Sequence, residues 1–205
     1  MQINLRHDPE RSLPVPHVER SADERALWAR ETAYAFAARE GFDDAAAERI
    51  TAALNDIAGA TGDDRRNLLL IGADGRVLAP FTVFAASEPL AEAEQAAFLW
   101  SASALLPPTT EVVESAQLGA GISVTLLERH DDHDYGFRRW LFVGQNATLG
   151  AVLGPVAPYG LAFVEGVAGS ILHESVLEGF LPSADRTRVE ELDAAVVRAG
   201  EDWPL

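Results

Sequence analysis

The stretch that decides the fold is residues 122–153, ISVTLLERHDDHDYGFRRWLFVGQNATLGAVL. Three runs rich in strand-forming residues, 122–129, 137–143 and 147–153, are separated by a polar tip and by a short turn. Strands that follow one another in sequence and are joined by short turns pair antiparallel. We therefore expect an antiparallel meander, with three strands or, if residues 111–117 also pair, four.

The middle run of the meander has large apolar residues on both of its faces. One face carries Phe137, Arg139, Leu141 and Val143, and the other carries Arg138, Trp140 and Phe142. A strand that is apolar on both faces belongs to a sheet that is covered on both sides. Arg139 would then point toward an apolar layer, where it needs a buried partner.

A hairpin is expected before the meander. Residues 67–71 and 76–84 flank Asp74-Gly75, which is a strong signal for a two-residue turn. Pro80 lies inside the second of these runs. Because proline lacks the N–H that a sheet ladder needs, it predicts a bulge or a sheet edge at that point.

Five amphipathic helices are expected to pack on this sheet. Their ranges are residues 21–40, 43–58, 87–106, 159–180 and 185–199. Ser21 and Glu24 have the spacing of a capping box, and Gly41 follows as a typical C-terminal glycine. We expect the fourth helix to be the central buried one, with Gly166 and Gly169 letting a neighbouring element approach closely.

The chain reads as one domain preceded by an arm. Residues 1–20 contain three prolines and are expected to form an extended N-terminal arm. Residues 21–205 then make a single α+β domain in which helices sandwich an antiparallel sheet. The length of 205 residues, with 48% of them hydrophobic, suffices for one sizeable core.

The net charge of the chain limits the classes of partner that it can bind. The chain has 32 acidic residues against 16 arginines and no lysine, which gives a formal net charge of −16. This arginine-only, alanine-rich composition is typical of a GC-rich, actinobacterial-type coding bias. A surface this negative repels phosphate backbones and anionic lipids, so we expect neither a nucleic-acid nor a membrane partner.

Cysteine usage and apolar patterning bear on location. The chain has no cysteine, which removes disulfides, thiol nucleophiles and cysteine metal ligands. Residues 1–16 lack the apolar core of a secretory signal, so we expect a cytoplasmic protein. The apolar stretch 147–172 is interrupted by Pro155, Pro158 and Glu165, and therefore predicts a buried strand and a packed helix, not a membrane span.

Residues 90–172 follow a definite order of elements. An amphipathic helix ends at Pro107, a strand follows, the glycine pair Gly119 and Gly121 leads into the meander, and an apolar helix closes the segment. This order resembles the PsbP-like fold superfamily, which includes a Ran-binding nuclear-import factor, a photosystem II extrinsic subunit and small actinobacterial proteins. The resemblance implies an antiparallel α+β fold but assigns no residue a role, because functions in that superfamily differ widely.

A rival topology is the cone-shaped α+β fold of small dehydratases and isomerases. It also runs helices, hairpin, helix and long strands, and it would place acid–base residues inside a pocket. No acidic or histidine side chain on an otherwise apolar strand face of this sequence makes a good candidate for such a residue.

The most conspicuous polar run is His130-Asp131-Asp132-His133-Asp134, whose side chains could ligate zinc or manganese. Hairpin tips are normally polar, so we expect this one to be exposed and free of a tightly held metal. His173-Glu174 lacks the second histidine of a zinc-protease helix because position 177 is Leu177, and Ser170 lacks the neighbours of a nucleophile elbow. We assign no catalytic, cofactor-binding or metal-binding residue and expect no cofactor.

Two classes of function are compatible with these observations. The leading expectation is a non-catalytic protein-binding or accessory domain whose acidic surface engages another protein or a second copy of itself. The alternative is a small-molecule-binding protein or enzyme with a cavity between the sheet and the helices. The lack of a catalytic signature favours the first class.

Overall fold

The computed structural model describes residues 2–17, 21–59, 65–72, 75–183 and 186–201. Its strands are β1 (Ile3–Asn4), β2 (Ser12–Val15), β3 (Arg65–Gly72), β4 (Val77–Ala86), β5 (Thr109–Ser115), β6 (Gly119–His130), β7 (His133–Val143), β8 (Thr148–Val156) and β9 (Val176–Leu177). Its α-helices are α1 (Ala22–Glu40), α2 (Asp44–Gly59), α3 (Glu92–Leu99), α4 (Leu161–Glu174) and α5 (Arg186–Glu201).

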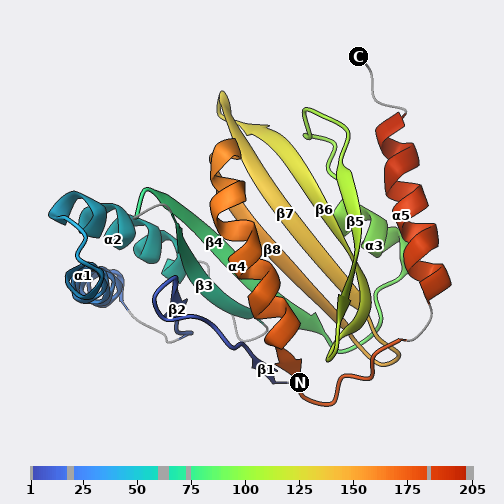
Figure 1. Cartoon of the computed structure of the whole chain (residues 1–205), viewed down its shortest axis with the longest axis horizontal. Helices are drawn as coiled ribbons and strands as arrows, with labels where there is room; N and C mark the ends of the chain where they lie inside the picture. The colour runs from blue at the N-terminus through green and yellow to red at the C-terminus, as the bar shows by residue number, and fades with distance from the viewer. Residues whose placement is uncertain (1, 18–20, 60–64, 73–74, 184–185, 202–205) are drawn as a thin grey trace.

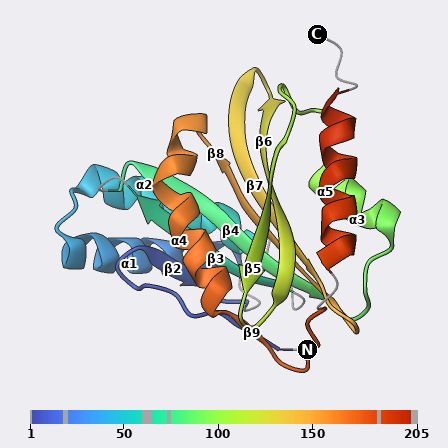
Figure 2. The same ribbon diagram turned by 45° about the vertical axis from the view of Figure 1, so that its right-hand side comes forward.

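The fold is an antiparallel sheet between two layers of helices, the α+β class expected from the sequence. Seven strands form the sheet in the order β2-β3-β4-β8-β7-β6-β5, and β1 pairs with β9 beside it. Helix α4 covers one face of the sheet (Figures 1 and 2). Two helix pairs, α1 with α2 and α3 with α5, cover the other face, each over its own hydrophobic cluster.

The expected meander is confirmed, and it has four strands. β5, β6, β7 and β8 pair in sequence order, and every pairing is antiparallel. The tip between β6 and β7 is shorter than predicted, because His130 and His133 already pair across the two strands. Asp131 and Asp132 make the turn with positive φ angles of 48° and 64°, a conformation that aspartate tolerates better than most residues.

β3 and β4 form the predicted hairpin. Residues 73–76 connect the two strands, with Gly75 at a φ of 76°, while Asp74 lies outside the described residues. Pro80 keeps its place in the ladder to β3, so the predicted bulge does not form. On the other side of β4, pairing with β8 begins only at Phe81. Pro80 therefore lies where that side of β4 is an edge and no N–H is needed, which is the second of the two predicted possibilities.

Helix α4 is buried as predicted but is shorter than residues 159–180. Residues 158–160 form a 3-10 turn before it, and Ser175 ends it with an extended backbone. The chain then enters β9, whose pairing with β1 takes the place of the last predicted helical turns. Val164, Ala168 and Ile171 are buried against the central strands of the sheet.

Helix α1 begins and ends where its sequence signals predict. The Ser21 hydroxyl accepts the Glu24 N–H, and the Glu24 carboxylate accepts the Ser21 N–H, which completes the capping box. Gly41 ends the helix with a left-handed φ of 74°, where a side chain would be strained.

Helix α3 is much shorter than the predicted helix over residues 87–106. It begins after Ala91 and ends at Leu99, and the residues that follow turn toward the sheet. The Leu105 N–H donates to the Leu127 carbonyl oxygen of β6 at 2.6 Å. Pairing with a strand thus replaces the last helical turn, which periodicity along one segment could not reveal.

The N-terminal residues, predicted to be an extended arm before the domain, form strands β1 and β2 with a turn at residues 9–11 between them, and both strands belong to the sheet structure. β2 adds to β3, and β1 adds to β9 after α4. The apolar stretch 147–172 forms β8 and α4, a strand followed by a packed helix, as predicted. Within the described ranges, no helix is both long enough and apolar enough to cross a membrane.

Candidate functional site

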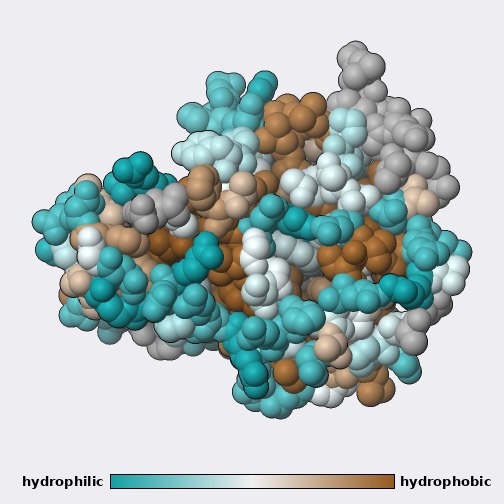
Figure 3. Space-filling model, viewed as in Figure 1, coloured by the Kyte–Doolittle hydropathy of each residue, from teal (hydrophilic) through white to brown (hydrophobic). Residues whose placement is uncertain are grey.

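A groove of about 300 Å³ runs between α4 and β5, which is the strand at one edge of the sheet. Residues 111–115 of β5 form one wall, and Gly169, Leu172 and His173 of α4 form the other. Trp140 and Phe142 of β7 lie at its floor. We call this hollow the β5 groove; the space-filling view of this face shows hydrophobic surface over β5 (Figure 3).

The floor of the β5 groove is aromatic and fixed in position. Trp140 and Phe142 alternate with Leu141 along β7, which directs both rings toward α4. Trp140 makes an edge-to-face contact with Phe81, with 6.0 Å between ring centroids. Gly121 on the neighbouring strand leaves room for the Phe142 ring, because a Cβ at that position would lie 2.5 Å from a ring carbon.

Arg138 bonds to Glu111, which lines one end of the β5 groove. Its guanidinium donates from Nη1 to Glu165 Oε2 of α4 at 3.1 Å, and from Nη2 to Ser123 Oγ of β6 at 3.0 Å and to the Glu111 carboxylate of β5. It also lies over the Trp140 ring, with Cζ 5.4 Å from the centroid. The Arg138 Nε is buried and has no hydrogen-bond partner among the described residues. Arg138 therefore joins the helix to the sheet edge.

Ser115 closes the opposite end. Its hydroxyl donates to the His173 carbonyl oxygen at 3.4 Å and accepts the N–H groups of Gln117 and Leu118 at 3.3 Å each. Because Ser115 bonds the His173 backbone and not its imidazole, these residues do not form a nucleophile–base pair. Between the two ends, a Cβ added at Gly169 would meet nothing within 4 Å, so the helix wall is open there.

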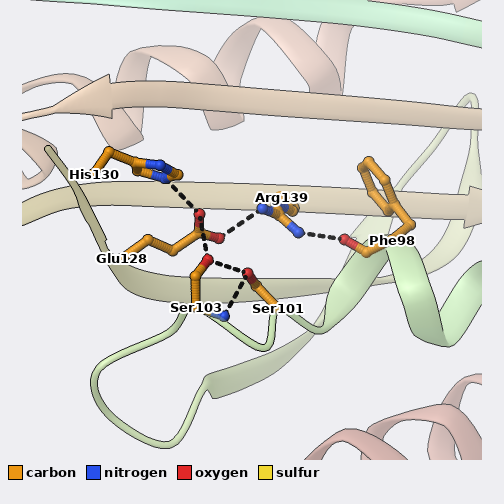
Figure 4. A network of polar contacts seen from close by, with 6 residues as sticks. All are labelled: Phe98, Ser101, Ser103, Glu128, His130 and Arg139. Atoms are coloured by element: carbon orange, nitrogen blue, oxygen red, sulfur yellow. Dashed lines mark hydrogen bonds and ion pairs between the residues drawn. The ribbon is translucent and has the colours of Figure 1, made fainter.

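A second polar cluster lies on the opposite face of the sheet, around Glu128 (Figure 4). Arg139 Nη2 donates to Glu128 Oε1 at 2.7 Å, and Arg139 Nη1 donates to the Phe98 carbonyl oxygen at 2.9 Å. Glu128 Oε2 lies 3.0 Å from His130 Nε2 and 3.5 Å from Ser103 Oγ. Glu128 is thus the buried partner that Arg139 was predicted to need, and the cluster holds the segment after α3 against β6 and β7.

The arginine of this cluster carries an electrostatic cost. Burial lowers the pKa of Arg139 below its ordinary value, and the charge of Glu128 partly opposes that shift. Both terminal nitrogens of Arg139 and both carboxylate oxygens of Glu128 bond to other groups of the chain, so the cluster is a structural ion pair by its geometry.

The hairpin tip that resembles a metal site in sequence is exposed, as predicted. Its candidate ligands bond in different directions: His130 reaches back to Glu128, His133 Nδ1 lies 2.9 Å from the Asp131 carbonyl oxygen, and Asp134 pairs with Arg129 at 2.8 Å. In the part of the chain that the structure describes, no three histidine or acidic side chains are grouped to hold a metal ion.

The other residues considered from the sequence, Ser170, His173 and Glu174, lie in the last turns of α4. Ser170 donates its hydroxyl to the Gly166 carbonyl oxygen within α4, at 3.0 Å. His173 and Glu174 end the same helix. The sequence did not indicate the β5 groove, because its two walls are far apart in the chain. No family model, no curated protein and no solved structure matches this chain.

Proposed function

We propose that the chain is a non-catalytic protein-binding domain whose β5 groove receives an extended, cationic segment of another protein. The observation that supports this most strongly is that β5 is an edge strand beside a groove with an aromatic floor. The outer side of an edge strand presents backbone donors and acceptors that another strand can pair with. The segment would add to β5 and place alternate side chains toward Trp140 and Phe142.

Charge decides which kind of segment fits. Glu111 and Glu114 lie on β5 with side chains 63% and 61% exposed, and the chain has a net charge of −16. Both carboxylates also pair with arginines of this chain, Arg138 and Arg186. A second copy of the chain would bring like charges together, which opposes self-association. A cationic partner is therefore favoured over a homodimer.

Two further expectations stand as proposals. The succession of hairpin, α3, four-stranded meander and α4 supports membership of the PsbP-like fold superfamily. A cytoplasmic location is proposed from the sequence and is tested by fractionating the native cell.

A peptide titration tests the binding function. The probe is a peptide of alternating arginine and valine, as long as the seven residues of β5, added while backbone amide NMR signals are followed. We expect shifts concentrated at residues 109–115 and around Trp140. The same peptide with alternate N-methylated amides should bind about tenfold or more weakly, because it lacks donors for strand pairing.

Charge variants provide the matched control. Glu111→Gln with Glu114→Gln should weaken peptide binding, whereas Glu31→Gln with Glu48→Gln, the same charge change on exposed positions of α1 and α2, should not. The proposal fails if the N-methylated peptide binds as well as the parent peptide, or if the shifts map elsewhere. Binding of small neutral aromatics in the groove, without binding of the peptide, would favour the small-molecule alternative.

A further inference from the structure

A second hollow, of about 320 Å³, lies where the N-terminal residues cross α4. Residues 6–8 and Arg11 line one side of it, and residues of α4 between Gly166 and Glu174 line the other side. In Figures 1 and 2 the N-terminal residues, in dark blue, pass beside the C-terminal half of α4, in orange. We call this hollow the arm groove. It shares no lining residue with the β5 groove.

The N-terminal residues are fixed on α4 at both ends of the arm groove. At the C-terminal end of the helix, β1 pairs with β9, which follows α4 in the chain. Toward the other end, Arg11 Nη2 donates to the Phe163 carbonyl oxygen of α4 at 3.0 Å. The turn before β2 is closed by the Ser12 hydroxyl, which donates to the Asp8 carbonyl oxygen at 2.6 Å. The groove is thus bounded by backbone pairing at one end and by a side-chain bond to the helix at the other.

The helix side of the arm groove has an apolar floor and one position without a side chain. Val167 and Ile171 form the floor and are 8% and 3% exposed. A Cβ added at Gly166 would meet nothing within 4 Å, so the space in front of it is open. The Ser170 hydroxyl donates to the Gly166 carbonyl oxygen, and its oxygen can still accept a hydrogen bond.

Opposite charges line the two sides of the arm groove. Arg6 and Arg11 belong to the arm side, and Glu174 belongs to the helix side. Within the described ranges, neither Arg6 nor Glu174 forms a hydrogen bond or an ion pair, with each other or with another residue. The bond from Arg11 goes to a neutral carbonyl oxygen. The groove therefore offers positive and negative groups that are not already joined to each other.

The remaining polar groups of the arm side bond within their own turn. Asp8 Oδ1 accepts the Glu10 N–H at 2.9 Å, and His7 Nδ1 lies 2.9 Å from Ser12 Oγ. On the helix side, Glu174 is the last residue of α4, where the negative end of the helix dipole adds to its charge. A cationic group is thus favoured at the Glu174 end of the helix, and an anionic group beside the two arginines.

We propose that the arm groove binds a small zwitterion that carries one carboxylate and one ammonium group, an α-amino acid or a dipeptide. The guanidinium groups of Arg6 and Arg11 match the oxygen pair of the carboxylate, and Glu174 with the Ser170 oxygen accepts the ammonium group. The floor accepts an apolar side chain, and the volume lies within the range of pockets that hold small ligands. A ligand with a single charge leaves the opposite charge of the groove without a partner. This site does not depend on the proposed peptide-binding function.

Four probes that share a phenyl group test the proposal on the unmodified chain. Phenylalanine and glycylphenylalanine are zwitterions, 3-phenylpropionate lacks the ammonium group, and 2-phenylethylamine lacks the carboxylate. We expect at least one of the two zwitterions to bind about tenfold or more tightly than either single-charge probe in calorimetry. The stronger zwitterion gives the preferred spacing of the two charges. Zwitterions that bind no better than the single-charge probes, or the absence of binding by all four, would overturn the proposal.

Charge variants then assign the two ends of the ligand. Glu174→Gln should weaken binding of the zwitterion about tenfold and leave that of 3-phenylpropionate unchanged, because only the ammonium group loses its partner. Arg6→Gln with Arg11→Gln should weaken the zwitterion and spare 2-phenylethylamine. Glu31→Gln and Arg76→Gln, the same charge changes at exposed positions elsewhere, should leave all four affinities unchanged. Undiminished zwitterion binding by folded Glu174→Gln contradicts the site.

A steric variant locates the site even if the double arginine variant does not fold. Gly166→Leu places a side chain in the open space of the arm groove and should abolish binding of the zwitterion. Gly169→Leu is the matched control, because it fills the β5 groove instead and should leave zwitterion binding unchanged. The same control should weaken binding of the arginine–valine peptide, so failure of one proposal is distinguishable from failure of the other. Zwitterion binding that survives Gly166→Leu would place the ligand elsewhere.

Discussion

Arg139 of β7 and Glu128 of β6 form an ion pair of 2.7 Å between Nη2 and Oε1, with side chains only 17% and 5% exposed. The two residues lie on the face of the sheet that α3 and α5 cover. Burying both charges is costly, and their mutual contact offsets that cost only while both are present.

Removing one partner of this pair should therefore destabilise the fold strongly. We expect Glu128→Ala to lower the free energy of unfolding by about 3–5 kcal/mol in a urea titration, because it leaves a buried guanidinium without a counter-charge. The double variant Glu128→Met with Arg139→Leu should recover most of that loss. An unfolding curve for Glu128→Ala that overlays the parent curve would show that the pair does not stabilise the fold.

The exposed ion pair between Arg129 and Asp134 at the hairpin tip predicts a dependence of stability on pH. The hydrogen bond from Arg129 lowers the pKa of Asp134 below its ordinary value, with smaller contributions from the charges of Arg129 and His133. A carboxyl group with a lowered pKa stabilises the fold above its unfolded-state pKa, and this contribution is lost as the pH falls through its folded-state pKa. Arg129→Gln should raise the pKa of Asp134 toward its ordinary value in a carboxyl-carbon NMR titration, and Arg76→Gln should not. An unchanged Asp134 pKa in the Arg129 variant would contradict the assignment.

Shortening the Ile171 side chain of α4 tests whether this helix packs on the core. Ile171 is 3% exposed against the sheet, so Ile171→Ala should lower the free energy of unfolding by about 2–5 kcal/mol. Leu106→Ala provides the control, because Leu106 is 59% exposed and its truncation should cost about 0.5 kcal/mol or less. If both variants unfolded at the same urea concentration, α4 would not be packed on the core as described.

The glycines of α4 face open space, which overturns the expectation of a closely packed neighbour. A Cβ added at Gly166 or Gly169 would meet nothing within 4 Å. Because glycine is unfavourable within a helix, each change to alanine should stabilise the chain by about 0.5–1 kcal/mol. Gly121→Ala should instead destabilise it through the Phe142 ring. Gly169→Ala should also weaken peptide binding in the β5 groove, whose wall Gly169 forms, while Gly166→Ala should not.

Metal addition tests the hairpin tip. His130 and His133 bond to different neighbours, so we expect micromolar zinc or manganese to leave the melting temperature unchanged. A rise of several degrees that is lost in the variant His130→Ala with His133→Ala would reveal a metal site formed by rearrangement of the tip.

Local signals predicted the elements that depend on neighbours in sequence. The capping box at Ser21, the left-handed Gly41 and the alternation around Trp140 all specify structure within a few residues, and each is confirmed. The need of Arg139 for a buried partner was also readable, because an arginine on an apolar strand face must be paired. The identity of that partner could not be predicted, because Glu128 is in sequence an ordinary polar residue near a hairpin tip.

The errors arise where distant segments meet. The sequence predicts C-terminal ends for α3 and α4 that lie too far along the chain. After α3, a hydrogen bond to β6 replaces the last predicted turn, and after α4, the pairing of β9 with β1 replaces the last predicted turns. The β5 groove likewise depends on which strand lies at the edge of the sheet. That order places β8 between β4 and β7, although the chain makes β5, β6 and β7 between β4 and β8. Periodicity within one segment carries no information about this order.

The pairing of β1 with β9 also determines how early during synthesis β1 can find its partner strand. Asn4 Nδ2 donates to Glu178 Oε1 at 3.2 Å, and the two residues lie 174 positions apart. On the ribosome, β1 therefore stays without this partner until residues 176–177 have been translated. Leu5, which follows that strand directly, packs against the hydrophobic core that α4 covers. A translation product that stops before β9 would leave β1 without the strand that pairs with it.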